Sequence, residues 1–116
     1  MTILCWNING ISDKLGDQEL VNVIKNHDIL VFLETLKDKN YSVNIPGYIS
    51  NHFAYGKRSK NAKRASGGML VLIKDIYKNH ISVDMVSEIS VWLKISKVTR
   101  KTHKDFCKFC IYPSKK

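Results

Sequence analysis

Two short polar segments, each at the end of an apolar run, hold the side chains best suited to chemistry. Asn7 and Asn9 follow the apolar run at residues 3–6, and Glu34 follows the apolar run at residues 29–33. A carboxylate at the end of a buried strand is a suitable ligand for Mg²⁺, which takes one or two protein carboxylates and otherwise binds water and substrate phosphate. Neighbouring amides can orient such a ligand without adding negative charge. The same residues also fit a plain turn and a solvated strand end, so both interpretations stay open.

The residues between these segments predict a helix that connects two parallel strands. Asp17 is a suitable N-cap, apolar residues recur at positions 20, 21, 23 and 24, and Lys25 and His27 lie where the helix dipole favours cations. The uninterrupted apolar run at 29–33 is typical of a strand buried on both faces. A right-handed βαβ crossover would make the two strands parallel, and Asn7 and Glu34 would then reach the same edge of the sheet.

Beyond Glu34 the pattern predicts antiparallel strands. Turn or basic segments separate five candidates, at residues 47–56, 67–75, 80–86, 89–96 and 105–112. In the fourth candidate, alternation places Val91 and Leu93 on one face and Trp92 and Lys94 on the other. The expected fold class is α+β, with one βαβ unit followed by antiparallel strands. One helix is too little to cover the parallel strands on both faces.

Composition limits the classes of function. The chain has 116 residues, 44% of them hydrophobic, which predicts one domain with a modest core. Its 19 Lys and Arg against 10 Asp and Glu give a net charge of +9, which favours an anionic partner such as nucleic acid. Three cysteines, an odd number, argue against a secreted disulfide framework, and no apolar run approaches the ~18 residues of a membrane span. We expect an intracellular protein, nuclear or cytoplasmic, with no membrane partner.

Two further segments carry candidate binding residues. The basic segment, residues 57–64, suits DNA phosphates, but it also suits a solvated hairpin loop or a nuclear-import cluster. Its five basic residues are Lys57, Arg58, Lys60, Lys63 and Arg64. Cys107 and Cys110 have zinc-knuckle spacing, yet the sequence offers no second pair of ligands, and residues three apart on a strand face opposite sides. We therefore expect no zinc site.

Five collinear motifs resemble the endonuclease/exonuclease/phosphatase superfamily, which includes the apurinic/apyrimidinic endonucleases and the endonuclease domains of non-LTR retrotransposons. "CWNING" and "DILVFLET" resemble its first two motifs. "KRASGGMLVLIKD", "SVWLKI" and "FCIYPS" resemble the Gly-Gly strand, the Trp-bearing strand and the Tyr-Pro strand of the retrotransposon branch. The resemblance covers nearly the entire chain, in order.

The resemblance implies a function for each candidate residue. Glu34 would hold a catalytic Mg²⁺, and Asn9 would support the metal. Asn7 would belong to the phosphate network, and Tyr112 would lie near the scissile phosphate of DNA. The implied fold is the N-terminal half of a four-layered sandwich of two packed sheets, so residues 1–116 would form a partial domain. The resemblance would place the basic segment near the DNA-binding side.

The chain also departs from the family pattern. Pro113 follows Tyr112 directly, whereas the family has one residue between them. The Gly-Asp-x-Asn and Asp-His motifs are not found in the 116 residues, and the histidines, at positions 27, 52, 80 and 103, lie at predicted segment edges or turns, where we expect solvated surface residues.

Three functional hypotheses follow from these departures. The first is a truncated, retrotransposon-derived, Mg²⁺-dependent DNA endonuclease domain that is inactive alone. Its uncovered sheet face would cause marginal stability, self-association or pairing with the missing C-terminal half. The second is a nuclease that another chain completes. The third is a non-enzymatic basic module that binds nucleic acid.

Overall fold

Two β-sheets and one α-helix make up the described part of the chain in the computed structural model, namely residues 1–12, 14–38, 40–54, 67–86, 91–97 and 105–111. The first sheet has the order β1 (Ile3–Asn7), β2 (Ile29–Leu33), β4 (Met69–Lys74) and β3 (Tyr48–Phe53). The second sheet has the order β5 (Ile81–Val86), β6 (Val91–Lys97) and β7 (Asp105–Ile111). Two short 3₁₀ helices are η1 (Lys14–Gly16) and η2 (Asp75–Tyr77). The α+β class predicted from the sequence is confirmed.

The βαβ unit forms as the sequence predicts. Helix α1 (Gln18–Lys25) begins after Asp17, whose side chain accepts a 3.0 Å hydrogen bond from the Glu19 backbone N–H. This bond satisfies one of the donors that every helix start leaves free. Strands β1 and β2 pair in parallel, with register from Ile3 opposite Ile29 to Asn7 opposite Leu33. The remaining strand pairs, β2–β4, β3–β4, β5–β6 and β6–β7, are antiparallel.

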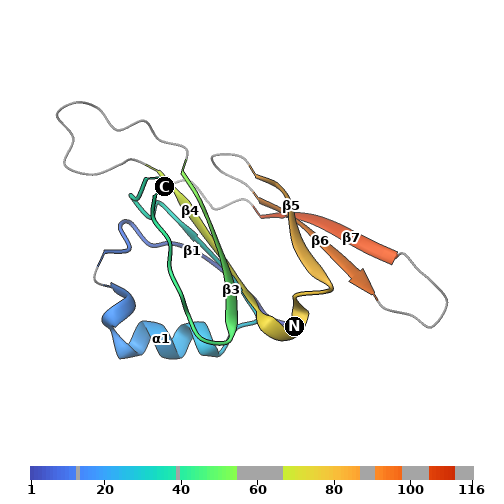
Figure 1. Ribbon diagram of the computed structural model, residues 1–116, viewed down its shortest axis with the longest axis horizontal. Helices are drawn as coiled ribbons and strands as arrows, with labels where there is room; N and C mark the ends of the chain where they lie inside the picture. Colours follow the sequence, from blue (N-terminus) through green and yellow to red (C-terminus); the bar gives the residue numbers. More distant parts are fainter. Residues whose placement is uncertain (13, 39, 55–66, 87–90, 98–104, 112–116) are drawn as a thin grey trace.

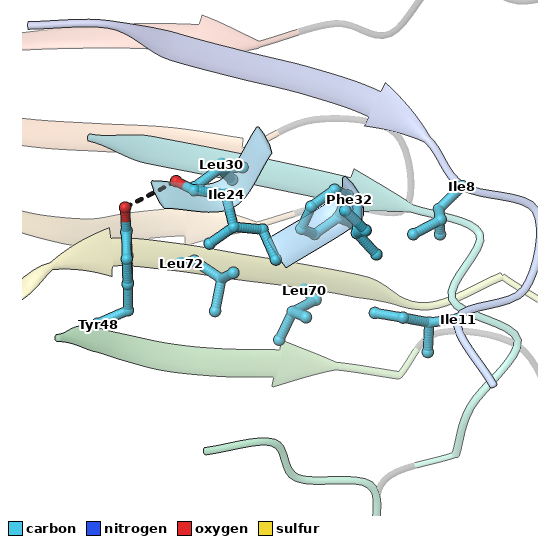
Figure 2. Close-up of a cluster of buried hydrophobic side chains, with 9 residues drawn as sticks. Ile8, Ile11, Ile24, Leu30, Phe32, Tyr48, Leu70 and Leu72 are labelled. Carbon is cyan, nitrogen blue, oxygen red and sulfur yellow. Dashed lines mark hydrogen bonds between the residues drawn. The ribbon is translucent and has the colours of Figure 1, made fainter. Parts of the chain in front are cut away.

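One core lies between the first sheet and α1 (Figure 2). Its buried members are Ile8, Ile11, Leu20, Ile24, Leu30, Phe32, Tyr48, Leu70 and Leu72. The Tyr48 hydroxyl on β3 donates to the backbone oxygen of Ile24 at 2.7 Å and lies equally close to that of His27. The last carbonyls of a helix have no partner within the helix. Tyr48 therefore attaches the end of α1 to the sheet.

A second core lies between the two sheets, on the side of the first sheet away from α1 (Figure 1). It consists of Ile29, Val31, Leu33, Met69, Val71 and Ile73 from the first sheet and Ile81, Val91 and Leu93 from the second. All five residues of β2 are buried, because α1 covers one face and the second sheet covers the other. The uncovered inner face expected from the sequence is therefore not found on β2 and β4.

The exposed large apolar side chains in the described part of the first sheet lie on its edge strands, two of them on β1 and Ile49 on β3. Among the described residues β1 pairs with β2 alone, so it forms an edge of the sheet. Ile3 is 39% exposed and Trp6 is 44% exposed, although the Trp6 ring lies 6.2 Å from that of Phe32 in the core. None of the helices in the described ranges has the length and apolar character needed to cross a bilayer.

Candidate functional site

The parallel pairing of β1 and β2 brings three candidate residues to one end of the first sheet, which we call the rim. Asn7 lies opposite Leu33, so Glu34 directly follows the residue that Asn7 faces. The Ile8 backbone N–H donates to the Leu33 oxygen at 2.9 Å, and the Gly10 N–H donates to the Glu34 oxygen at 2.7 Å. The loop that carries Asn9 is thus hydrogen-bonded along the segment that carries Glu34.

The backbone at the rim is unusual at three residues that are not glycine. Asn9 has φ 49°, Glu34 has φ 53° and Leu36 has φ 60°. The left-handed region costs a non-glycine residue roughly 1–2 kcal/mol, with Asn the most tolerant type. In the Asn9 turn, the Asn7 side-chain oxygen accepts a 3.1 Å hydrogen bond from the Asn9 N–H. Backbone strain of this kind tends to gather at functional sites.

The chemical groups at the rim are one carboxylate, two amides and one ammonium. Asn7, Asn9 and Glu34 are all solvent-exposed. In the described ranges no three His, Cys, Asp or Glu side chains gather closely enough to hold a metal. Glu34 is the carboxylate among the rim residues named here, and the other oxygen donors are the amides of Asn7 and Asn9. That donor set fits Mg²⁺, which keeps several waters and binds through few carboxylates. The Lys14 ammonium donates to the Ile8 backbone oxygen, which places a positive charge on the loop between the two asparagines.

Behind the rim, Thr35 and His52 form a contact that the sequence analysis missed. Thr35 is fully buried, and its Oγ1 lies 2.7 Å from His52 Nε2, a hydrogen bond whose donor depends on the histidine tautomer. His52 lies within β3 and is half-buried, so the expectation of a solvated surface histidine at a segment edge is wrong for this residue. The alternation in β3 could have shown this, because His52 shares a face with the buried Tyr48.

The surroundings of His52 oppose its protonation. The Tyr41 ring packs edge-on against the imidazole, with centroids 5.0 Å apart. Burial lowers the pKa of His52, and the negative charge of Asp38 raises it by a smaller amount. Among the described residues, nothing donates to or accepts from His52 Nδ1. The imidazole therefore favours its neutral form.

Two glycines let the chain pass close to this pair. The Thr35 N–H donates to the Gly68 oxygen at 3.2 Å, and the Leu36 N–H donates to the Gly67 oxygen at 2.8 Å. A Cβ on Gly68 would overlap Thr35 Oγ1 and would lie 3.4 Å from His52 Nε2. Gly68 also has φ 91°, a left-handed value that favours glycine. Close packing against Thr35 thus requires glycine at position 68, and the φ of 68° at Gly67 also favours glycine.

The other candidate residues lie outside the described ranges. They are Tyr112 and the basic segment with Lys57, Arg58, Lys60, Lys63 and Arg64. Strand β7 ends at Ile111, directly before Tyr112. Their roles stay predictions from the sequence.

Comparison with known proteins finds a similarity in structure but none in sequence. No protein-family profile matches the sequence, and no curated protein sequence matches it. Among solved structures, the chain is similar to the 3′ phosphatase NExo from Neisseria, solved with a product DNA hairpin, at a TM-score of 0.49 and 17% sequence identity. The similarity covers 83% of this chain and 38% of that one, so this chain spans about two fifths of that protein's length.

Proposed function

We propose that this chain is the N-terminal, metal-binding part of a Mg²⁺-dependent phosphodiesterase domain that acts on DNA, of the retrotransposon endonuclease type. The observation that carries the proposal is the parallel pairing of β1 and β2, which brings Asn7, Asn9 and Glu34 to one rim. Those residues also have the order and spacing of the motifs that resemble the endonuclease/exonuclease/phosphatase superfamily. The left-handed backbone of Glu34 supports a functional position over a plain strand end.

Each rim group has a role in this proposal. Glu34 and Asn9 would hold Mg²⁺, and Asn7 would orient a phosphate oxygen. The metal would supply positive charge against the negative charge that develops on phosphate during hydrolysis. Lys14 would contribute a fixed cation on the same loop, and Tyr112 would lie beside the phosphate. The basic segment and the net charge of +9 would attract the DNA backbone.

Under the same proposal, we expect the 116 residues to have no catalytic activity by themselves. Besides the metal and the groups at the rim, phosphodiester hydrolysis needs a group that activates water and a further donor to the nonbridging oxygens as their charge develops. The resemblance assigns those roles to motifs that these residues do not contain. We therefore expect metal binding and DNA binding without cleavage.

The edge strand β1 is the place where a second chain, or a further part of a longer one, would complete the site. In a parallel pair, alternate residues direct their backbone groups to the partner. Thr2 and Ile8 bond to β2, so the N–H and C=O groups of Ile3, Cys5 and Asn7 point to the open edge. A strand added there would end beside Asn7 and could supply the absent groups at the rim.

Metal binding tests the proposal directly. Mn²⁺, a paramagnetic substitute for Mg²⁺, would be titrated into the wild-type chain and into Glu34→Gln, with free Mn²⁺ measured by electron paramagnetic resonance. Loss of the carboxylate should weaken binding by roughly tenfold or more, equivalent to about 1.4 kcal/mol. Glu19→Gln is the matched control. Glu19 is exposed on α1, so this substitution makes the same chemical change away from the strand ends.

DNA binding separates the alternatives. Fluorescence anisotropy of a duplex would be measured with and without Mn²⁺, together with a nicking assay. Binding that Mn²⁺ strengthens in the wild type but not in Glu34→Gln supports the proposal. Equal Mn²⁺ affinity of wild type and Glu34→Gln would refute it, and DNA binding independent of metal would then identify a basic binding module.

A further inference from the structure

The segment that carries Glu34 is held from both sides. On one side, the Gly10 N–H donates to the Glu34 oxygen and the Ile11 N–H donates to the Thr35 oxygen, at 2.7 and 3.1 Å. On the other side, the Thr35 N–H donates to the Gly68 oxygen at 3.2 Å. These bonds connect the loop after β1 to the start of β4 through Thr35.

These backbone bonds restrain the peptide groups on both sides of Glu34, and a side chain anchored beside them would add to their hold on its left-handed form. Both residues that flank Thr35, Glu34 and Leu36, have positive φ. Such strain persists only where the surroundings hold the residue in place. The one side chain between them is that of Thr35, which is fully buried.

The side chain of Thr35 depends on His52 for its hydrogen bond. A buried hydroxyl without a hydrogen-bond partner is unfavourable, so Thr35 Oγ1 favours the position in which it meets His52 Nε2. The imidazole is itself held by β3 and by the Tyr41 ring. The absence of a side chain on Gly68 leaves the space that the pair occupies.

We propose that Thr35 and His52 act as a positioning pair that holds the Glu34 turn in its left-handed form, so that the Glu34 carboxylate is preorganised to bind a divalent cation. Neither residue would touch the metal. They act as supporting residues behind a metal ligand. Loss of such supporting residues commonly lowers metal affinity by about tenfold or more. The role in metal binding rests on the function proposed for the rim, whereas the effect on the Glu34 backbone does not.

Two substitutions of Thr35 separate the hydroxyl from the shape of the side chain. Thr35→Val has nearly the same shape but no hydroxyl, and Thr35→Ser keeps the hydroxyl with less volume. We expect Thr35→Val to weaken Mn²⁺ binding by about tenfold and Thr35→Ser to bind like the wild type. Far-UV circular dichroism and thermal melting establish that each variant is folded. His52→Phe, which cannot hydrogen-bond to Thr35 Oγ1, is the second test if Thr35→Val does not fold, and it should weaken Mn²⁺ binding in the same way.

A second readout does not depend on metal. The ¹³Cα and ¹³Cβ chemical shifts of Glu34 report its backbone conformation, and the imidazole ¹⁵N shifts report the tautomer and the hydrogen bond of His52. The proposal expects Thr35→Val to move both sets of shifts and Thr35→Ser to leave the Glu34 shifts in place.

The outcomes distinguish the two proposals. If Thr35→Val is folded and keeps both the Glu34 shifts and the Mn²⁺ affinity of the wild type, the positioning pair is refuted. If Glu34→Gln binds Mn²⁺ like the wild type but Thr35→Val still moves the Glu34 shifts, the metal function fails and the positioning pair stands. If Thr35→Ser loses Mn²⁺ affinity as Thr35→Val does, packing rather than the hydrogen bond holds the turn, and the proposed role of His52 is refuted.

Discussion

At the scale of single residues, His52 gives the structure a dependence on pH. Burial lowers its pKa below the ordinary value of 6.5. The unfolded state then takes up a proton at a higher pH than the folded state does. The stabilisation from neutral His52 is therefore present above about pH 6.5 and is lost as pH falls through the lower folded-state pKa.

We expect the free energy of unfolding, measured by urea denaturation, to decrease as pH falls below 6.5, the ordinary histidine value. In His52→Gln this decrease should be smaller, because the group responsible has been removed. His27→Gln is the matched control, since His27 is half-buried at the end of α1. An identical pH dependence in wild type and His52→Gln would contradict the prediction.

The sequence could reveal Asn7, Asn9 and Glu34 as site candidates because each lies next to an apolar run along the chain. It could not reveal the contact between Thr35 and His52. These residues are 17 positions apart, and they meet across Gly68, which precedes β4, the strand that lies between β2 and β3. That arrangement depends on sheet order, which local patterns do not contain.

At the scale of elements, three glycines allow backbone conformation and steric contact to be tested separately. Gly16 has neither positive φ nor any atom within 4 Å of an added Cβ. Gly47 has φ 87° with equally open space. Gly68 combines φ 91° with the close approach of Thr35 Oγ1.

We expect Gly16→Ala to change the free energy of unfolding by less than about 0.5 kcal/mol. Gly47→Ala should cost roughly 1–2 kcal/mol, the strain of a left-handed alanine. Gly68→Ala should cost clearly more than Gly47→Ala, because the new methyl group must also displace Thr35 or His52. Urea denaturation of the three variants gives the comparison. Equal losses in the free energy of unfolding for Gly47→Ala and Gly68→Ala would show that Thr35 moves aside without a measurable cost.

Most elements could be predicted from local patterns, because periodicity and capping act over a few residues. The Asp17 cap, α1 and the parallel β1–β2 pair are all as predicted. The sequence did not predict that β4 lies between β2 and β3. Continuous apolar runs identify both β2 and β4 as buried strands, but they do not specify which strand is the neighbour.

At the scale of the whole molecule, the second sheet covers the face of β2 and β4 that was expected from the sequence to be uncovered. Alternation correctly identified Val91 and Leu93 as one face of a strand, and that face fills the core over β2 and β4. In the described part of the first sheet, the exposed large apolar side chains lie on the two edge strands, Ile3 and Trp6 on β1 and Ile49 on β3. An open edge strand without charge is a site where chains associate.

We expect sedimentation velocity of the wild-type chain to show association that increases with protein concentration. Ile3→Lys places a charge on the open edge and should shift the population toward monomer. Ile76→Lys is the control, because Ile76 is 68% exposed but belongs to η2 and not to a strand edge. Equal association of wild type and Ile3→Lys would show that β1 is not the contact.

The position of β4 between β2 and β3 also affects the order of events during synthesis. Strand β2 can pair with β1 as soon as the first βαβ unit has left the ribosome. Its other edge must wait for β4, since Ile29 pairs with Ile73 and Leu33 pairs with Met69. Closing so long a loop delays this pairing, and five consecutive apolar residues stay open to other chains meanwhile. A nascent chain that stalls before β4 would thus be the form most in need of a chaperone.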